Sequence, residues 1–342
     1  MIAAHSNGGG YANLFQQHET DAGNPGILQS VLAELWDFDT RISRVGSPPQ
    51  PAPQDFLQSL GTPIRGYYQT PPNPACYFNA QLQSGRWANY YTDLQNGVTD
   101  SGVPPLPPGP YNDTNTTDSG NTLYYTHHLI REFMLLDAAA TNNVTNMPPG
   151  PAAWPTREYP YHIVPKEWVL THPGDDRVPS YTNGPSHVSG EKYLLIDNFD
   201  PSSSNALTFS SRAVGFTTFL FELQDATNSA VPLAPNWFGV AVPDGITDYR
   251  NVIIYFHPNP AQSGANYQPA DYQDKSGAHG TNWKELYAYV ERLGKQIAGS
   301  ENTNQILIFP FMENYDDVGL LPQYWYCIVM DILDQLYNNR SS

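Results

Sequence analysis

The first fifteen residues, MIAAHSNGGGYANLF (1–15), decide the fold, because three local patterns follow one another there. Residues 1–4 form a short apolar run, residues 5–9 form a Gly-rich turn, and residues 11–17 can begin a helix. This order predicts a strand, a sharp turn and a helix. A serine at the turn, here Ser6, has its hydroxyl held clear of the backbone and facing the positive end of the helix.

The residues around Ser6 form a degenerate version of a known catalytic pattern. Ala4 and Gly8 are small, as a tight bend requires, and the stretch is A-x-S-x-G, one methyl group away from G-x-S-x-G. This pattern is typical of an acyl-transfer nucleophile. The alternative interpretation is a disordered Gly-rich terminus, because terminal residues are often poorly ordered.

The chain is acidic, with 16 Lys+Arg against 33 Asp+Glu and a formal net charge of -17. This charge argues against binding to nucleic acid or to anionic lipid headgroups through counterion release. Neutral or apolar partners are therefore expected. Charged residues are scarce whereas Pro, Gly and Tyr are plentiful, a composition more usual in secreted proteins than in cytosolic ones.

No segment contains 18 uncharged apolar residues in a row, so no transmembrane helix is expected. The apolar residues 2–4 are far too few for a signal peptide. Cys76 and Cys327 are far apart in the sequence and can form one disulfide or none, and neither has the spacing of a metal or redox motif. The oligomeric state cannot be inferred from these patterns.

No cofactor is expected from the remaining motifs. No G-x-G-x-x-G or phosphate-binding loop pattern follows a predicted strand, so a nucleotide is not predicted. His172, Asp175 and Asp176 are the nearest approach to a metal-binding set, but adjacent aspartates in a Pro-Gly turn are more often solvated loop residues.

The second half of the chain predicts an α/β fold with a mostly parallel sheet. Residues 251–256 (NVIIYF) and 305–309 (QILIF) are apolar runs suited to strands buried on both faces. Each run is followed by apolar residues at helical spacing, over 283–293 and 322–337. Strand, helix, strand, helix is the order of a parallel α/β sheet. Upstream, residues 214–223 and 237–242 are expected to form an antiparallel pair.

The first half is predicted with less detail. We expect strands over 27–36, 64–69 and 123–126, and a helix over 129–140. Pro-rich stretches cannot be helix or central strand and are interpreted as surface loops or cap segments; they span 47–53, 103–110 and 147–155.

Joined end to start, this order of elements resembles the α/β-hydrolase fold cut open just before its nucleophile strand. The resemblance implies a single circularly permuted domain over 1–342. In it, residues 1–155 carry the nucleophile, acid and histidine, residues 156–192 contain the usual termini, and residues 193–342 correspond to the usual N-terminal half. Permutation is physically reasonable because domain termini often lie at the surface and close together.

The resemblance implies a Ser-His-Asp triad. The nucleophile falls on Ser6. The general base falls on a histidine pair, where His127 is preferred and His128, closer to the helix body, is the alternative. The carboxylate that orients the imidazole falls on Asp39, with Asp37 as the alternative. Two further aspartates remain outside candidates, Asp93 and Asp100.

The resemblance also implies an oxyanion hole. One donor is the backbone N–H of Asn7, and the second comes from the loop 257–261 (HPNPA). Two prolines remove two donors from this loop, so the second donor is expected from Asn259 or from the N–H of Ala261.

The expected activity is therefore hydrolysis of a carboxylic ester through an acyl-enzyme, as in an esterase, lipase or depolymerase, with no metal or organic cofactor. An acidic chain rich in aromatic residues suits a neutral, apolar acyl substrate, whether a lipid, a small ester or a polyester. Two alternatives stay open: a hydrolase-fold binding protein with weak or no activity, and an aromatic-rich carbohydrate-binding module.

Overall fold

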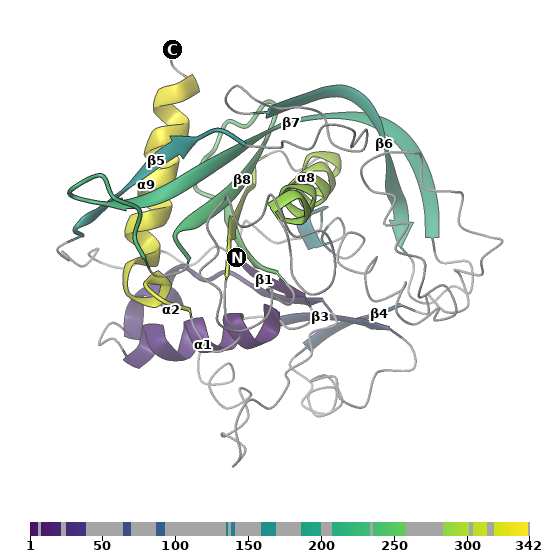
Figure 1. Cartoon of the computed structure of the whole chain (residues 1–342). Helices are drawn as coiled ribbons and strands as arrows, with labels where there is room; N and C mark the ends of the chain where they lie inside the picture. Colours follow the sequence, from purple (N-terminus) through teal and green to yellow (C-terminus); the bar gives the residue numbers. More distant parts are fainter. Residues whose placement is uncertain are drawn as a thin grey trace, which may run out of the picture.

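The strands pair into one mixed sheet with helices on both faces (Figure 1). The structure is a computed structural model of the whole chain, and it describes residues 1–5, 8–21, 25–38, 64–69, 87–92, 135, 138–140, 159–168, 186–199, 207–232, 235–257, 283–300, 304–312 and 318–340. The predicted α/β class is confirmed.

The sheet has the order β4-β3-β2-β1-β9-β10-β8-β7-β5, and β6 also pairs with β7. From β4 to β10 all neighbours are parallel, whereas β8, β7, β5 and β6 are joined by antiparallel pairs. The strands are β1 (Ile2–His5), β2 (Leu35–Phe38), β3 (Ile64–Gln69), β4 (Trp87–Thr92), β5 (Tyr161–Lys166), β6 (Ser186–Phe199), β7 (Leu207–Asp225), β8 (Trp237–Pro243), β9 (Val252–Phe256) and β10 (Ile306–Pro310).

The first strand of the chain lies in the middle of the sheet. β1 is parallel to β2 on one side and to β9 on the other. Its ladder begins at the first residue, because the Met1 amine donates to the Val252 carbonyl at 2.7 Å and the Ile254 N–H donates to the Met1 carbonyl at 3.0 Å. The apolar residues after Met1 are therefore buried on both faces.

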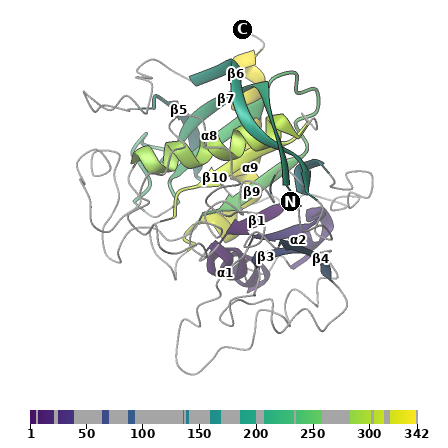
Figure 2. The same cartoon turned by 90° about the vertical axis from the view of Figure 1, so that its right-hand side faces the viewer.

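Helices cover the two faces unequally. On one face α1 (Gly8–Asp21) packs against β1, β9, α2 (Pro25–Val31) and α9 (Leu321–Arg340). On the other face α8 (Trp283–Gly299) packs against β7, β8 and β10 (Figure 2). Figure 1 also shows β6 and β7 curving past α8.

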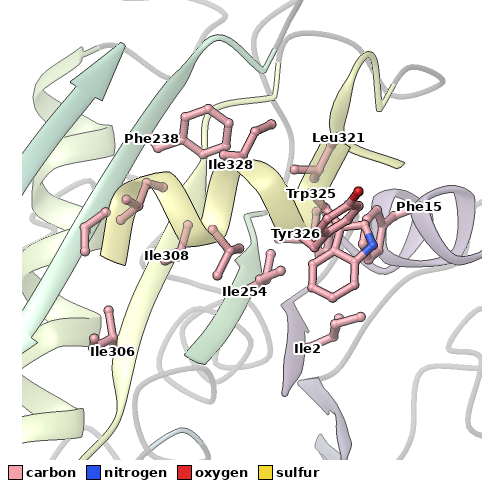
Figure 3. Packing of buried hydrophobic residues seen from close by; sticks show 14 of the residues in the cluster. Ile2, Phe15, Phe238, Ile254, Ile306, Ile308, Leu321, Trp325, Tyr326 and Ile328 are labelled. Carbon is pink, nitrogen blue, oxygen red and sulfur yellow. The ribbon is translucent and has the colours of Figure 1, made fainter. Parts of the chain in front are cut away.

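The two faces differ in composition because side chains alternate along each strand. We call the face under α1 and α9 the apolar face (Figure 3); it includes Ile2, Ala4, Phe238, Val240, Ile254, Phe256, Ile306 and Ile308, packed against Phe15 of α1 and Trp325 of α9. We call the opposite face the aromatic face; its buried strand residues include Trp36, Phe38, Tyr255 and Phe309, together with His5, Thr218, Glu222 and Gln224.

The strand predicted over 27–36 is wrong in its first part, which is helical. α2 spans Pro25–Val31, and the strand begins only at Leu35. Proline suits the first turn of a helix, and Ile27, Leu28 and Val31 recur at helical spacing. The Ser30 hydroxyl donates to the Ile27 carbonyl at 2.8 Å, which is a helical back-bond.

The other predicted elements of the second half are confirmed, although β7 (Leu207–Asp225) begins well before the predicted 214–223 and α8 (Trp283–Gly299) extends beyond the predicted 283–293. β9, β10, α8 and α9 lie where the apolar patterns placed them, and β7 and β8 are an antiparallel pair. β3 is confirmed over 64–69. The interval 156–192, expected as a connector, contains β5 and the beginning of β6.

Several predictions lie outside the described residues. They are the strand over 123–126, most of the helix over 129–140 and the three Pro-rich stretches. Within that helix, residue 135 and residues 138–140 are described and are helical. In the described part of the chain, no helix is both long enough and apolar enough to cross a membrane.

Candidate functional site

The strand order changes direction between β1 and β9. From β1 the chain passes through α1 and α2 to β2 on one side, whereas from β9 it passes through α8 to β10 on the other. The helices that follow β1 and β9 accordingly lie on opposite faces (Figure 2). In open α/β sheets, ligands bind outside the carboxyl ends of the strands at such a topological switch point. The ends of β1 and β9 are therefore the candidate site.

Only two residues separate β1 from α1. The strand ends at His5 and the helix begins at Gly8, so the predicted strand and the helix that follows it are confirmed in order. Ser6 and Asn7 themselves lie outside the described residues. Of the five residues predicted as a turn, His5 belongs to β1, and Gly8 and Gly9 belong to α1.

Gly8 lies directly against the end of β9. A Cβ at this position would collide with the Phe256 carbonyl oxygen and would be 2.9 Å from the His257 carbonyl oxygen. These are backbone atoms and cannot rotate away, so the position requires glycine. The small residue expected two positions after Ser6 therefore has a specific cause, which is the approach of the helix to the neighbouring strand.

The sequence placed His257, the residue after β9, at the start of the loop 257–261, but no role was predicted for its side chain. Its imidazole is buried, its Nε2 accepts the Met312 N–H at 3.0 Å, and its ring stacks on Phe309 with centroids 5.2 Å apart. Tyr11 of α1 is 6.2 Å away, centroid to centroid. The sequence offered one signal: His257 ends an apolar run and lies two residues after Tyr255, so the strand alternation puts both on the same face of the sheet.

A row of aromatic rings runs across the aromatic face beneath this site. Phe38 stacks on Tyr255 with centroids 6.2 Å apart, and Tyr255 stacks on Phe309 at 5.7 Å and an interplanar angle of 8°. His5 belongs to the same face, because it is in register with Phe38. Both histidines at the ends of β1 and β9 are buried.

The predicted catalytic residues fall almost entirely outside the described residues. Of the triad and oxyanion candidates, Ser6, Asn7, Asp39, His127, His128 and Asn259 lie outside them. Asp37 lies in β2, where its Cα is in register with Ala4, two residues before Ser6. The remaining candidates also lie outside the described residues; they are Cys76, Asp93, Asp100, His172, Asp175 and Asp176.

Two other predictions concern metals and thiols. Among the residues that the structure describes, no group of three or more His, Cys, Asp or Glu side chains could hold a metal ion. Cys327 is a half-buried free thiol on α9.

Comparison with known proteins adds no relative. No protein-family model matches the chain, and neither the curated proteins nor the solved structures contain a match.

Proposed function

We propose that this protein is a serine hydrolase of carboxylic esters, built on an α/β-hydrolase-like fold in circularly permuted order. One observation carries the proposal. Only two residues, Ser6 and Asn7, lie between the end of the central strand β1 and the start of its helix α1, at the topological switch point of the sheet. A serine at a strand-to-helix turn in this position is the arrangement of a nucleophile elbow.

The close packing of Gly8 supports the same proposal. α1 begins against the carboxyl end of β9, where Gly8 lies beside the backbone of Phe256 and His257. An oxyanion hole needs one N–H from the residue after the nucleophile and one from such a neighbouring loop. Asn7 and Asn259 occupy these two segments in the sequence.

The position of α9 supports the permuted order. α9 follows β10 and packs on α1, where Trp325 and Phe15 have ring centroids 6.3 Å apart. Near its other end, Tyr337 lies 6.4 Å from Tyr249, centroid to centroid, just before β9 begins. α9 thus runs back to the end of the sheet at which the parallel strands β1 and β9 begin, as a crossover helix leading into β1 would.

The proposed reaction is a double displacement at an acyl group. His127 takes the proton of Ser6 as the hydroxyl oxygen attacks the ester carbonyl, and the N–H groups of Asn7 and the Asn259 loop stabilise the oxyanion. His127 then returns the proton to the leaving alcohol as the ester C–O bond breaks, and water hydrolyses the acyl-enzyme by the same route. Asp39 orients the imidazole. His128 and Asp37 are the alternatives for the last two roles.

The test is labelling with a fluorophosphonate probe together with turnover of p-nitrophenyl butyrate. We expect Ser6→Ala to abolish labelling and to lower kcat by at least about 10⁴-fold. Ser30→Ala is the matched control, because its hydroxyl only bonds the Ile27 carbonyl within α2. Equal turnover by wild type and Ser6→Ala rules out Ser6 catalysis.

The same experiment separates the alternatives. An unlabelled wild-type protein that binds esters without cleaving them is a hydrolase-fold binding protein. An unlabelled protein that binds oligosaccharides is a carbohydrate-binding module.

A further inference from the structure

Three tyrosine rings gather where α9 packs against β5, the strand at the end of the sheet order (Figure 1). Tyr161 begins β5, Tyr159 lies two residues before it, and Tyr324 lies in the first turn of α9. All three side chains are half-buried, so each keeps some surface toward solvent. We call these three residues the tyrosine cluster.

The rings of the tyrosine cluster are steeply inclined to one another. Tyr161 meets Tyr324 at 79° and Tyr159 at 76°, with centroids 5.4 and 6.0 Å apart. Tyr159 and Tyr324 have centroids 5.8 Å apart and an angle of 51°. Three perpendicular rings that share a cation about 4 Å from each centroid have their centroids about 6 Å from one another. The observed separations therefore suit a small cation held by three ring faces.

A carboxylate belongs to the same cluster. Asp331 follows Tyr324 by about two turns of α9 and accepts the Ile163 N–H of β5 at 2.9 Å. Burial, and after it the Asp331 carboxylate, raise the pKa of the Tyr159 phenol, so this carboxylate lies beside the rings. Within the described part of the chain, no Lys or Arg side chain forms an ion pair with Asp331.

The surroundings of Asp331 favour an added positive charge. Burial raises its pKa and the neighbouring Asp334 carboxylate raises it further, whereas the Ile163 N–H and His162 lower it. A partly buried carboxylate without a full cationic partner is costly to ionise. The net charge of -17 also attracts cations to the protein. A bound cation would therefore offset the cost of ionising Asp331.

We propose that the tyrosine cluster and Asp331 form a binding site for a quaternary ammonium group, such as that of choline. Ring faces and a carboxylate can hold this group without hydrogen bonds, because it has no N–H to satisfy. A primary ammonium carries three donors that need acceptors. The proposal is independent of ester hydrolysis, since the four residues belong to β5, the segment just before it and α9 and none is a candidate of the triad.

The test is a titration of the full chain with choline chloride at constant ionic strength, followed by NMR of isotope-labelled tyrosine rings. We expect the signals of Tyr159, Tyr161 and Tyr324 to shift with one common Kd. The neutral analogue of choline, in which carbon replaces the nitrogen, should bind at least about fivefold more weakly. Equal affinity for choline and this analogue would overturn the assignment to a cation.

Variants separate the ring from the charge. Tyr161→Leu removes one ring, Tyr161→Phe keeps it, and Asp331→Asn removes the charge while an acceptor for the Ile163 N–H remains. We expect Tyr161→Leu and Asp331→Asn each to raise the Kd for choline by about fivefold, and Tyr161→Phe to leave it near the wild-type value. The matched control is Tyr337→Leu, because Tyr337 is an exposed tyrosine of the same helix that meets Tyr249 edge to face.

Packing of the three rings on one another, without a ligand, is the other explanation of their geometry. Ring signals that stay unchanged throughout the choline titration would establish it and overturn the proposal. An equal rise in Kd from Tyr337→Leu would do the same. If Tyr161→Leu does not fold, Asp331→Asn decides: weaker binding supports the site, and wild-type affinity overturns it.

Discussion

The two faces of the central sheet are built from different kinds of residue. On the apolar face, β1, β9, β10, β8 and β7 present aliphatic and phenyl side chains to α1 and α9. On the aromatic face, the same strands present His5, Thr218, Glu222 and Gln224 among their buried side chains, and His257 continues the row after β9. α8, which covers part of this face, also buries Glu291, Arg292 and Lys295.

The difference affects the stability of the sheet. Burying apolar area stabilises the fold by about 25 cal/mol per Å², whereas burying a polar group costs free energy unless it is hydrogen-bonded. The apolar face therefore stabilises the sheet and offsets the polar groups gathered on the other face. Both buried histidines at the switch point, His5 and His257, belong to the aromatic face.

The largest expected effect is on the apolar face. Phe15 is fully buried between Phe256 and Trp325, with ring centroids 5.7 and 6.3 Å away. We expect Phe15→Ala to lower the free energy of unfolding by about 4 kcal/mol, because it removes a buried ring and leaves a cavity. Urea denaturation measures the loss. Phe15→Leu, which keeps much of the volume, should cost below about 1.5 kcal/mol; similar losses from both would mean that α1 is loosely packed.

The next effect tests the contact between α1 and β9. Gly8→Ala should destabilise the protein by about 3 kcal/mol, because the new methyl group meets backbone oxygen atoms that cannot move aside. Gly10→Ala is the control two residues along the same helix, where a Cβ meets nothing within 4 Å. Alanine forms helix better than glycine, so Gly10→Ala should stabilise by roughly 1 kcal/mol. Thermal unfolding compares the two, and equal shifts of the same sign would contradict the described contact.

A smaller effect is expected from an ion pair on the aromatic face. Lys166 Nζ lies 2.9 Å from Glu222 Oε2, which also accepts from Gln224 Nε2 at 2.6 Å. Lys166→Met leaves a buried carboxylate with Gln224, and we expect a loss of about 2 kcal/mol in urea denaturation. Glu222→Gln should cost less, since the Lys166 side chain is 34% exposed and can reach water. A larger loss from Glu222→Gln than from Lys166→Met would contradict the described burial of Glu222 and exposure of Lys166.

The smallest effect concerns the pH dependence of stability at Asp331 of α9. Its carboxylate accepts the Ile163 N–H of β5 at 2.9 Å, and burial raises its pKa, an effect that this hydrogen bond partly opposes. Because the pKa is higher in the folded than in the unfolded state, the folded protein binds more protons between the two values. Stability should therefore fall as pH rises from about 4 through that window.

Asp331→Asn tests this expectation, because its side-chain oxygen can still accept from Ile163 while the charge is absent. Urea denaturation at several pH values should show that the variant lacks the decline seen in wild type. A variant that loses more stability than wild type toward neutral pH would show that the ionised carboxylate is favourable there.

Sequence patterns predicted the elements that depend on near neighbours in the chain. β9 and β10 were found because strands buried on both faces are apolar without interruption, and α9 because its apolar residues step by three and four. The prediction of a strand over 27–36 was wrong in its first part, because the spacing of apolar residues in a short run does not distinguish a strand from a helix. Pro25, a residue that suits the first turn of a helix, was not used as a sign of a helix start.

The candidate site divides in the same way. The turn at Ser6 was predicted from five residues, and the structure confirms the strand and the helix around it. The contacts of His257 were not predicted, because its partners Met312 and Phe309 lie more than 50 residues away in the chain. The assignments of His127 and Asp39 remain predictions.

The amino-acid sequence by itself determined the α/β class and the bend after the first strand. Both follow from the period of apolar residues and the backbone freedom of glycine, which act over a few residues. Only the tertiary structure decided that β1 lies between β2 and β9, that Gly8 contacts the end of β9, and that the polar residues gather on one face. Strand pairing depends on contacts between distant segments, and the local pattern of a strand does not specify which strand becomes its neighbour.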